Sequence, residues 1–423
     1  MKYFHERFFM TETENIKAPT KTILAALDTG EYDAESSMDE LEELAKTANA
    51  EVLARVIQKR PSADAATVLG EGKIDELAEL AKDLEAELIV FDTELTASEI
   101  RNIEDVVKVR VIDRTMLILD IFAGRAVSNE GKLQVELAQL RYRLPRLMGI
   151  GRSLSRLGGG IGTRGPGEKQ LETDRRHIQR RIEKLEADLK ELETRRSFSR
   201  SRRKKDNVMT AAIVGYTNAG KSTLLNRLTD AGVLAENKLF ATLDLTSRAI
   251  ELPDGRSVTL IDTVGLIRRL PHHLVEAFRS TLEEAASADI ILHVSDISDP
   301  EAKEKTLTTE KLLAELGCGE IPVVHVLNKC DTVDYNIPED DTTVCISAKT
   351  GEGLERLLEC IAKNLPESAE RMSLLVPYDR AGFIAEIRAL GKVLSEEYTE
   401  NGVAVEALVD ITLVSKAKEF QRS

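Results

Sequence analysis

The sequence of 423 residues is poor in aromatic side chains and in cysteine. It has no Trp, and Phe, Trp and Tyr together make up only 4%. Base stacking on aromatic rings is therefore excluded as the main binding device, which leaves charge and backbone groups. Four Cys, in apolar settings, are too few for a disulfide framework or a zinc site, so we expect a reducing, intracellular compartment.

Long apolar runs are also missing. No stretch of about 18 uninterrupted apolar residues occurs, and the opening residues MKYFHERFFM carry charges within their apolar part. We therefore expect neither a membrane span nor a signal peptide, and a cytoplasmic protein. Hydrophobic residues (42%) and charged residues (31%) are present in ordinary globular proportions, and the length predicts several domains.

Charge is unevenly distributed along the chain. The formal net charge is −15, but residues 141–205 hold 20 Lys+Arg against 8 Asp+Glu, a net +12, and the remainder carries −27. One basic segment on an acidic body indicates a single surface that meets a polyanion. A solvated helix face is the alternative, and the length of the block disfavours it.

The first 130 residues alternate short apolar runs with helical periodicity, after a polar tail that we predict to be flexible over 1–20. Strands at 23–27, 52–57, 88–92 and 109–113 alternate with helices, which predicts a parallel-sheet α/β domain over 21–130. Within it, Gly70-Glu71-Gly72-Lys73 opens a helix and leaves two interpretations. We favour a tight strand-to-helix turn over a second nucleotide site.

Residues 131–205 predict an antiparallel coiled-coil hairpin. Leucines at 133, 137, 140, 144 and 147 form one stripe, and apolar residues at 171, 178, 182, 185, 189 and 192 form a second. The tip, 149–167, contains eight Gly, three Arg and one Pro, which predicts an irregular, basic loop that binds a phosphate-lined space or is merely solvated. A basic linker, RRSFSRSRRKK, is predicted to end the arm.

Residues 206–368 predict a doubly wound α/β domain with one antiparallel edge hairpin. We expect strands at 210–214, 248–252, 257–262, 289–294, 321–327 and 344–347, and helices that include 273–286, 301–315 and 353–364. A small α/β appendage over 369–423 should have a strand at 373–376, a helix at 379–394 and paired strands from 403 to 414. It shows no recognisable chemistry.

A phosphate-binding motif, GYTNAGKS, lies between the first of these strands and a helix. Its glycines let backbone N–H groups approach phosphates, Lys221 can reach the β and γ oxygens, and the Ser222 hydroxyl can bind Mg²⁺. After a later strand, Asp262 can hold a magnesium-bound water and the Gly265 N–H can meet the γ-phosphate. These residues predict a nucleoside triphosphate site.

The base is specified by a third motif, Asn-Lys-Cys-Asp. The Asp331 carboxylate can accept from both the ring N–H and the exocyclic amine of guanine, and Ser-Ala-Lys after the next strand can supply a backbone N–H. The nucleotide is therefore predicted to be GTP. In the loop FATLD, Thr242 is the expected second hydroxyl ligand of Mg²⁺ and makes this loop a switch, with Thr246 a weaker candidate.

The segments LQVELAQLRYRLPRL, GGGIGTRGPGE, GTRGPGEKQLETDRR, FATLD and DTVGL together resemble the HflX family of bacterial ribosome-splitting GTPases over nearly the whole chain. The resemblance implies binding to rRNA of the large ribosomal subunit, an arm tip near the peptidyl-transferase region, and GTP hydrolysis during splitting or recycling. We expect a monomer that is partly ribosome-associated. A GTPase of subunit assembly and a non-catalytic GTP-dependent binding module are the alternatives.

Two residues bear on the rate of hydrolysis. Leu266 directly follows Gly265, where many related GTPases have a water-orienting Gln, so intrinsic hydrolysis should be slow and stimulated by ribosomes. Asn218 resembles a potassium ligand found in some such GTPases, and the alternative is that it only caps its loop.

The predicted functional residues fall into three sets. Lys221, Thr242 and Gly265 are the catalytic candidates, with Ser222, Thr242 and Asp262 at Mg²⁺ and Asn218 at K⁺. Arg152, Arg156 and Arg164 are predicted to contact the ribosome. The GTP site comprises Gly215, Tyr216, Thr217, Asn218, Ala219, Gly220, Lys221, Ser222, Phe240, Ala241, Thr242, Leu243, Asp244, Asp262, Thr263, Val264, Gly265, Asn328, Lys329, Cys330, Asp331, Ser347, Ala348 and Lys349.

Overall fold

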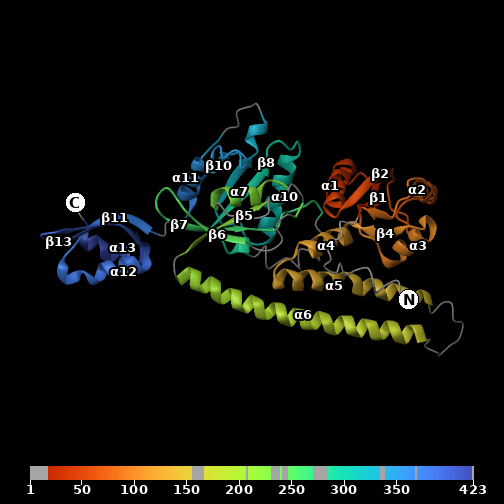
Figure 1. The fold of residues 1–423 in the computed structure, drawn as a ribbon, viewed down its shortest axis with the longest axis horizontal. Coiled ribbons are helices and arrows are strands. Elements are labelled where there is room, and N and C mark those ends of the chain that lie inside the picture. The colour runs from red at the N-terminus through yellow and green to blue at the C-terminus, as the bar shows by residue number, and fades with distance from the viewer. Residues whose placement is uncertain are drawn as a thin grey trace. The chain divides into compact units, whose positions relative to one another are not determined.

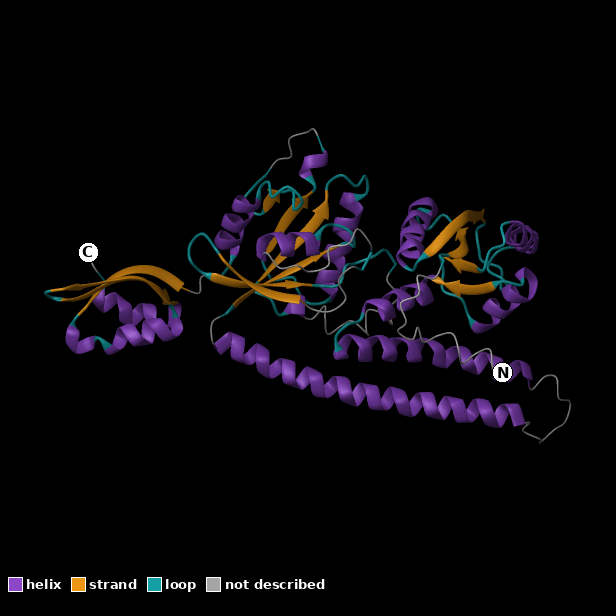
Figure 2. Ribbon diagram, in the orientation of Figure 1, coloured by secondary structure: helices purple, strands orange, loops and turns teal. Residues whose placement is uncertain are grey.

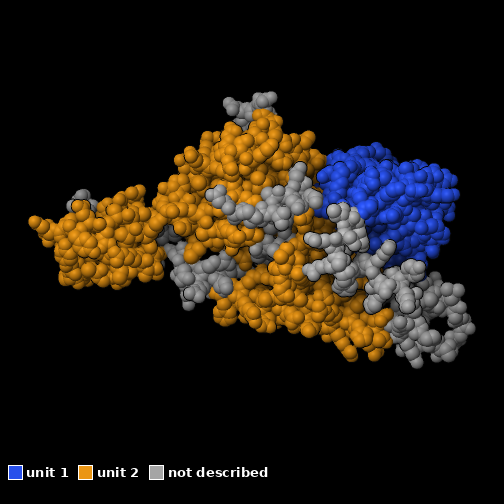
Figure 3. Space-filling view, in the orientation of Figure 1, with its two compact units in different colours: residues 1–120 blue, residues 121–423 orange. Residues whose placement is uncertain are grey.

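A computed structural model describes residues 18–154, 166–205, 208–229, 239–240, 246–269, 284–333, 339–366 and 369–421. The chain divides into two compact units, Met1–Asp120 and Ile121–Ser423 (Figure 3). Among the described residues, no helix combines the length and apolar character needed to cross a membrane.

The first unit contains a four-stranded parallel sheet in the order β2-β1-β3-β4. Buried apolar side chains of the strands and helices form one core, and Asp33 and Thr96 cap helices α1 and α3. The predicted parallel α/β fold is confirmed. The elements are β1 (Thr20–Asp28), α1 (Ala34–Thr47), β2 (Ala50–Lys59), α2 (Glu71–Asp83), β3 (Leu88–Phe91), α3 (Ala97–Val107), β4 (Arg110–Asp113) and the start of α4 (Arg114–Arg125).

Two long helices of the second unit, α5 (Asn129–Leu154) and α6 (Pro166–Lys205), pack side by side (Figure 1). Leu137, Ile182 and Leu185 are buried between them, so the predicted stripes do meet. Ion pairs Arg141–Glu186 (2.8 Å) and Arg181–Glu136 (2.6 Å) join the helices across this seam.

Two expectations about this arm were wrong. Residues 149–154 continue α5 and 166–167 begin α6, although the whole of 149–167 was expected to be irregular. The basic segment 195–205 is the last part of α6 rather than a linker. The physical reason is that Arg and Lys favour helix and that Pro166 stands at the first helical position, where its missing N–H costs nothing.

A six-stranded sheet in the order β10-β9-β8-β5-β7-β6 forms the centre of the second unit. All neighbours are parallel except β6 and β7, the predicted edge hairpin. Apolar cores lie on both faces, as in a doubly wound fold. The elements are β5 (Met209–Gly215), α7 (Lys221–Thr229), β6 (Thr246–Glu251), β7 (Ser257–Asp262), β8 (Ile290–Asp296), α10 (Ala302–Glu315), β9 (Val323–Asn328), η2 (Cys330–Thr332), β10 (Thr343–Cys345) and α11 (Leu354–Asn364). Most of the predicted helix 273–286 lies outside the described residues.

The C-terminal residues form a three-stranded antiparallel sheet in the order β11-β13-β12, with both helices on one side (Figure 2). The predicted helix 379–394 was too long: the observed helix spans Gly382–Leu390, and the backbone at Gly391 is extended (φ −135, ψ −158). Glycine allows the close approach to Leu408 there, since a Cβ would meet Leu408 O at 2.2 Å. Of the paired strands predicted from 403 to 414, residues 403–410 do form a strand, β13, whereas residues 411–414 begin a helix, and the strands that pair with β13 lie earlier in the chain. The elements are β11 (Ala369–Val376), η3 (Tyr378–Arg380), α12 (Gly382–Leu390), β12 (Lys392–Thr399), β13 (Gly402–Asp410), α13 (Ile411–Ala417) and η4 (Lys418–Phe420).

Candidate functional site

The loop between β5 and α7 turns tightly at two glycines, where any side chain would collide with neighbouring residues. Gly215 has φ +153, and a Cβ there would meet Val294 O at 2.2 Å. Gly220 has φ +97, and its Cβ would meet Asn328 Nδ2 at 2.1 Å. Asn218 is exposed with φ 63, a left-handed conformation that Asn tolerates better than most residues. The geometry is that of a backbone cradle for phosphate.

Lys221 begins α7 and is only 6% exposed. Its ammonium group donates to two carbonyl oxygens of the loop, Gly215 O at 3.0 Å and Tyr216 O at 2.7 Å. Burial lowers its pKa to about 8, against the opposing effect of Asp262. A desolvated cation held inside the loop is suited to binding anionic phosphate oxygens. These oxygens would replace the two carbonyl oxygens as partners of the ammonium group.

The end of β7 lies against the start of α7. The Ser222 hydroxyl donates to Asp262 Oδ2 at 3.0 Å, and Asp262 is fully buried. A Cβ on Gly265 would meet Thr217 Cγ2 at 2.7 Å and Lys221 Nζ at 3.1 Å, so this backbone approaches the phosphate loop closely. Hydroxyl and carboxylate oxygens together form a donor set that suits Mg²⁺.

Hydrogen bonds tie the remaining residues of these two motifs into the fold. Thr217 N donates to Leu266 O at 2.8 Å, and the Thr263 hydroxyl donates to Ile213 O at 2.8 Å. Ala219 and Val264 are buried, and their side chains help to fix the two loops. The phosphate-binding motif and the motif around Asp262 and Gly265 are therefore held together.

The end of β9 connects the phosphate loop to the loop after β10. Asn328 is 2% exposed, its Nδ2 donates to Ala219 O at 2.7 Å, and its Oδ1 accepts from Ala348 N at 2.9 Å. One amide side chain thus joins segments more than 100 residues apart in the chain. Asn328 therefore has a structural role, in addition to its predicted place in the base-binding motif.

The other residues predicted to bind the base lie in the same loops as Asn328 and Ala348. Lys329 has φ 67 and forms an ion pair with Asp296, and the Cys330 N–H donates to Ile346 O at 3.1 Å. Asp331 and Lys349 are exposed, whereas Ser347 is buried and its hydroxyl accepts from the Thr350 N–H at 3.1 Å. An exposed carboxylate beside a rigid loop can meet an incoming base.

Part of the predicted site lies outside the described residues. This applies to Ala241, Thr242, Leu243 and Asp244, and the neighbouring Thr246 begins β6. Phe240 is described and is buried against Phe122, with ring centroids 4.6 Å apart in an edge-on arrangement.

Leu266 follows Gly265 and is 3% exposed, in an apolar cluster with Tyr216, Val214 and Ile291. Its N–H donates to Gly215 O at 3.1 Å. The side chain therefore packs on the sheet and offers no group that could orient water.

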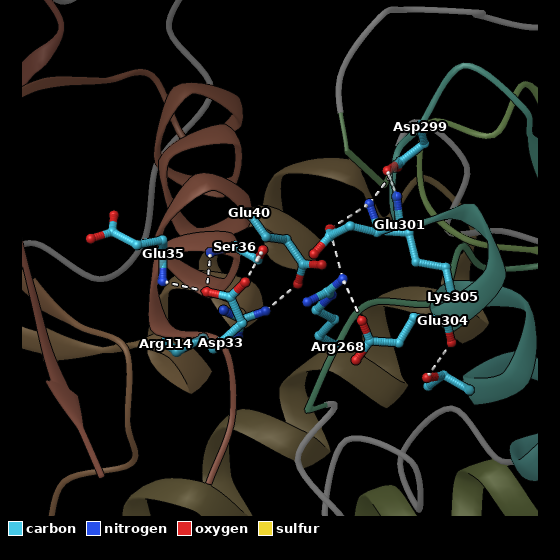
Figure 4. Close-up of polar contacts among 11 residues, drawn as sticks. Asp33, Glu35, Ser36, Glu40, Arg114, Arg268, Asp299, Glu301, Glu304 and Lys305 are labelled. Atoms are coloured by element: carbon cyan, nitrogen blue, oxygen red, sulfur yellow. Dashed lines mark hydrogen bonds and ion pairs between the residues drawn. The ribbon is translucent and has the colours of Figure 1, made fainter. Parts of the chain in front are cut away.

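Sequence reasoning missed a set of charged residues next to the site. Arg268 pairs with Glu301 at 2.6 Å and with Glu304 at 3.8 Å, and Lys305 pairs with Asp299 (Figure 4). The signal for Arg268 was its place three residues after Gly265, although its partners are remote in sequence. Asp296, the partner of Lys329, could have been found because it ends a buried strand beside β9.

The predicted ribosome-contacting residues cannot be located from their side chains. Arg156 and Arg164 lie outside the described residues, and for Arg152 only the helical backbone of α5 is described. Their role therefore stays a prediction.

Three family models match successive parts of the chain. They describe a GTP-binding GTPase N-terminal region (residues 35–123), a GTP-binding GTPase middle region (125–203) and a 50S ribosome-binding GTPase (210–329).

Curated relatives match across almost the full length. GTPase HflX of Caldanaerobacter subterraneus subsp. tengcongensis is 50% identical over 95% of this chain and 93% of its own length. GTPase HflX of Lacrimispora saccharolytica is 52% identical over 95% and 96% respectively. A crystal structure of SsGBP with GDP is 26% identical, with a TM-score of 0.48 over 81% of this chain and 98% of that one.

Proposed function

This chain belongs to the HflX family of GTPases and is a GTP-hydrolysing enzyme, and on that premise we propose that it binds the large ribosomal subunit and splits or recycles stalled ribosomes. The observation that carries the proposal is the match of its nucleotide-binding domain to a model described as a 50S ribosome-binding GTPase. The net charge of +12 over 141–205 gives the same chain a basic arm suited to rRNA phosphates.

The proposed reaction is attack of water on the γ-phosphate to give GDP and phosphate. Lys221 would meet the β and γ oxygens, and the backbone N–H of Gly265 would donate to the γ-phosphate as charge develops there. The closeness of Gly265 to the Lys221 ammonium supports this division of roles, since both groups address the same space.

Mg²⁺ fits the donor set of Ser222 and Asp262, whose oxygens are 3.0 Å apart. Ser222 would bind the ion directly, Asp262 would act through a water, and Thr242 is the proposed second hydroxyl. When bound, the ion supplies positive charge at the bridge between the β- and γ-phosphates. Binding of K⁺ by Asn218 is proposed separately, and the exposed amide of this residue supports it.

Water must be oriented by something other than the side chain after Gly265. Leu266 is buried and apolar, so we propose that isolated protein hydrolyses GTP slowly and that the ribosome completes the site. A stimulation of about tenfold or more, roughly 1.4 kcal/mol of barrier, is the expected size.

Sedimentation of intact ribosomes tests the proposed function. The wild type with GTP should convert 70S particles to subunits, whereas the Arg152→Ala, Arg156→Ala, Arg164→Ala triple variant should bind GTP normally and split poorly. Binding should weaken steeply with salt, because each phosphate contact releases counterions. Intact 70S particles with the wild type and GTP would contradict splitting, and binding only to immature subunits would favour the role in assembly.

A further inference from the structure

Two histidines lie opposite each other on adjacent parallel strands of the second unit. His293 on β8 is paired in register with His325 on β9, and their ring centroids are 5.6 Å apart. Glu310 of α10 lies beside them. One potential ligand atom from each of the three residues lies within 4.8 Å of the other two.

The packing of α10 explains why Glu310 lies there. Alternate residues of β8 face this helix: Ile291 shares an apolar cluster with Leu313, and the Ser295 hydroxyl lies 3.1 Å from the Thr306 hydroxyl. His293 stands between Ile291 and Ser295, as Glu310 stands between Thr306 and Leu313. The three side chains therefore belong to one layer between the sheet and the helix.

His293 has a buried nitrogen that the fold leaves unused. The residue is 2% exposed, and its Nδ1 has no hydrogen-bond partner among the described residues. A buried polar atom without a partner is costly and calls for a ligand. Burial, with help from His325 and Lys221, lowers the pKa of His293 to about 4, so the ring is neutral and keeps a lone pair.

We propose that His293, His325 and Glu310 form a binding site for a divalent transition metal ion of the zinc class. Two imidazoles and one carboxylate are a known donor set for Zn²⁺ with water at the fourth position, whereas Mg²⁺ prefers oxygen ligands only. His325 is partly exposed and Glu310 is exposed, which gives the ion and its water a path from solvent.

The required closure is small. Tetrahedral zinc with bonds of about 2.0–2.1 Å sets its ligand atoms about 3.3 Å apart, so the present spacing must shrink by up to about 1.5 Å. A change of rotamer at exposed Glu310 can bring its carboxylate closer to the two rings. The bound ion would fasten α10 to β8 and β9, and it uses no residue predicted to bind GTP or Mg²⁺.

Metal binding to the full chain tests the proposal directly. Untagged protein loaded with GDP and excess Mg²⁺ keeps its phosphate site occupied while it is dialysed against Zn²⁺ or titrated with Co²⁺. The wild type should retain one equivalent. Affinity should fall roughly tenfold or more in Glu310→Gln and further in His325→Ala, since even outer-shell changes cost about 10–100-fold. The matched control is His177→Ala, an exposed histidine of α6, which should bind like the wild type.

Several results would overturn the site. These are unchanged affinity in both Glu310→Gln and His325→Ala, no retained metal in the wild type, or a thiolate-to-cobalt charge-transfer band that marks a cysteine ligand. Thermal unfolding separates a metal site from a packed histidine pair. Saturating Zn²⁺ should raise the Tm of the wild type by about 5 °C and leave that of His325→Ala unchanged; equal shifts in both proteins would contradict the proposal. Glu310→Gln changes only an exposed helical side chain, so a folded variant is available.

Discussion

Two turns in this molecule lead from a strand toward a helix through glycine and lysine, and only one of them forms a phosphate cradle. In the second unit, Gly215 and Gly220 have positive φ, and Lys221 is buried against loop carbonyls. In the first unit, Gly70 has an ordinary φ of −68, and Lys73 pairs with Glu76 at 2.8 Å on the helix surface.

The difference shows that backbone curvature, rather than the Gly and Lys content, makes the cradle. A Cβ would fit at Gly72, where no atom lies within 4 Å, but would collide at Gly220. Residues 70–73 thus have the geometry of a helix cap, which favours the strand-to-helix turn among the two interpretations of this segment.

The largest predicted effect is the difference in GTP hydrolysis between variants at the two lysines, Lys221 and Lys73. Lys221→Ala should reduce GTP hydrolysis by about 10³-fold or more, because the described site has no second cation at the same place. Lys73→Ala should hydrolyse GTP at the wild-type rate. Phosphate release with and without ribosomes measures both, and a loss of activity in Lys73→Ala would break the comparison.

Two carboxylates that follow buried strands, Asp331 and Asp92, should have different roles, one in nucleotide binding and one in stability. Asp331→Asn should weaken GTP binding by about 2–4 kcal/mol, because a charged contact to two donors is lost and an amine faces an amine. Asp92, which accepts from Arg114 at 2.8 Å and from the Ser37 hydroxyl at 2.6 Å, is structural. Asp92→Asn should leave GTP affinity unchanged and lower the stability of the first unit. Nucleotide titration and urea unfolding distinguish the two, and unaltered GTP affinity in Asp331→Asn would refute the base assignment.

Replacing each of two glycines by alanine tests the role of backbone curvature directly. Gly220→Ala should cost about 2 kcal/mol in stability and weaken nucleotide binding, because the new methyl group meets Asn328 at a φ that alanine rarely adopts. Gly72→Ala should be neutral or stabilising by up to about 1 kcal/mol, since it lies in open space inside α2. Denaturation midpoints measure this contrast, and equal losses would contradict it.

The smallest effect concerns pH. The pKa of Lys221 is lowered from 10.5 to about 8 in the folded protein, so between pH 8 and 10.5 the unfolded chain binds the extra proton. Stability must therefore rise with pH across that window. Urea unfolding of nucleotide-free wild type against Lys221→Met isolates this contribution, and a slope shared by both proteins would rule it out.

Much of the fold and of the candidate site follows from short segments of sequence. The alternation of apolar strands and periodic helices predicted the parallel sheet of the first unit and the mostly parallel sheet of the second, and the apolar stripes over 133–147 and 171–192 predicted the helix pair. The phosphate loop was readable because its geometry is made by consecutive residues. Helix ends were less predictable: the basic residues after 195 fit a linker or a helix equally well from composition alone.

The sequence by itself determined the local chemistry: the cradle of 215–222, the apolar residue after Gly265 and the basic arm. Tertiary structure alone decided which distant groups meet. Asn328 joins Ala219 to Ala348, Arg268 finds Glu301, and His293 stands opposite His325. The physical reason is strand register: side chains on neighbouring strands meet only after the strands have paired, and a shift of one residue would turn His325 to the other face of the sheet.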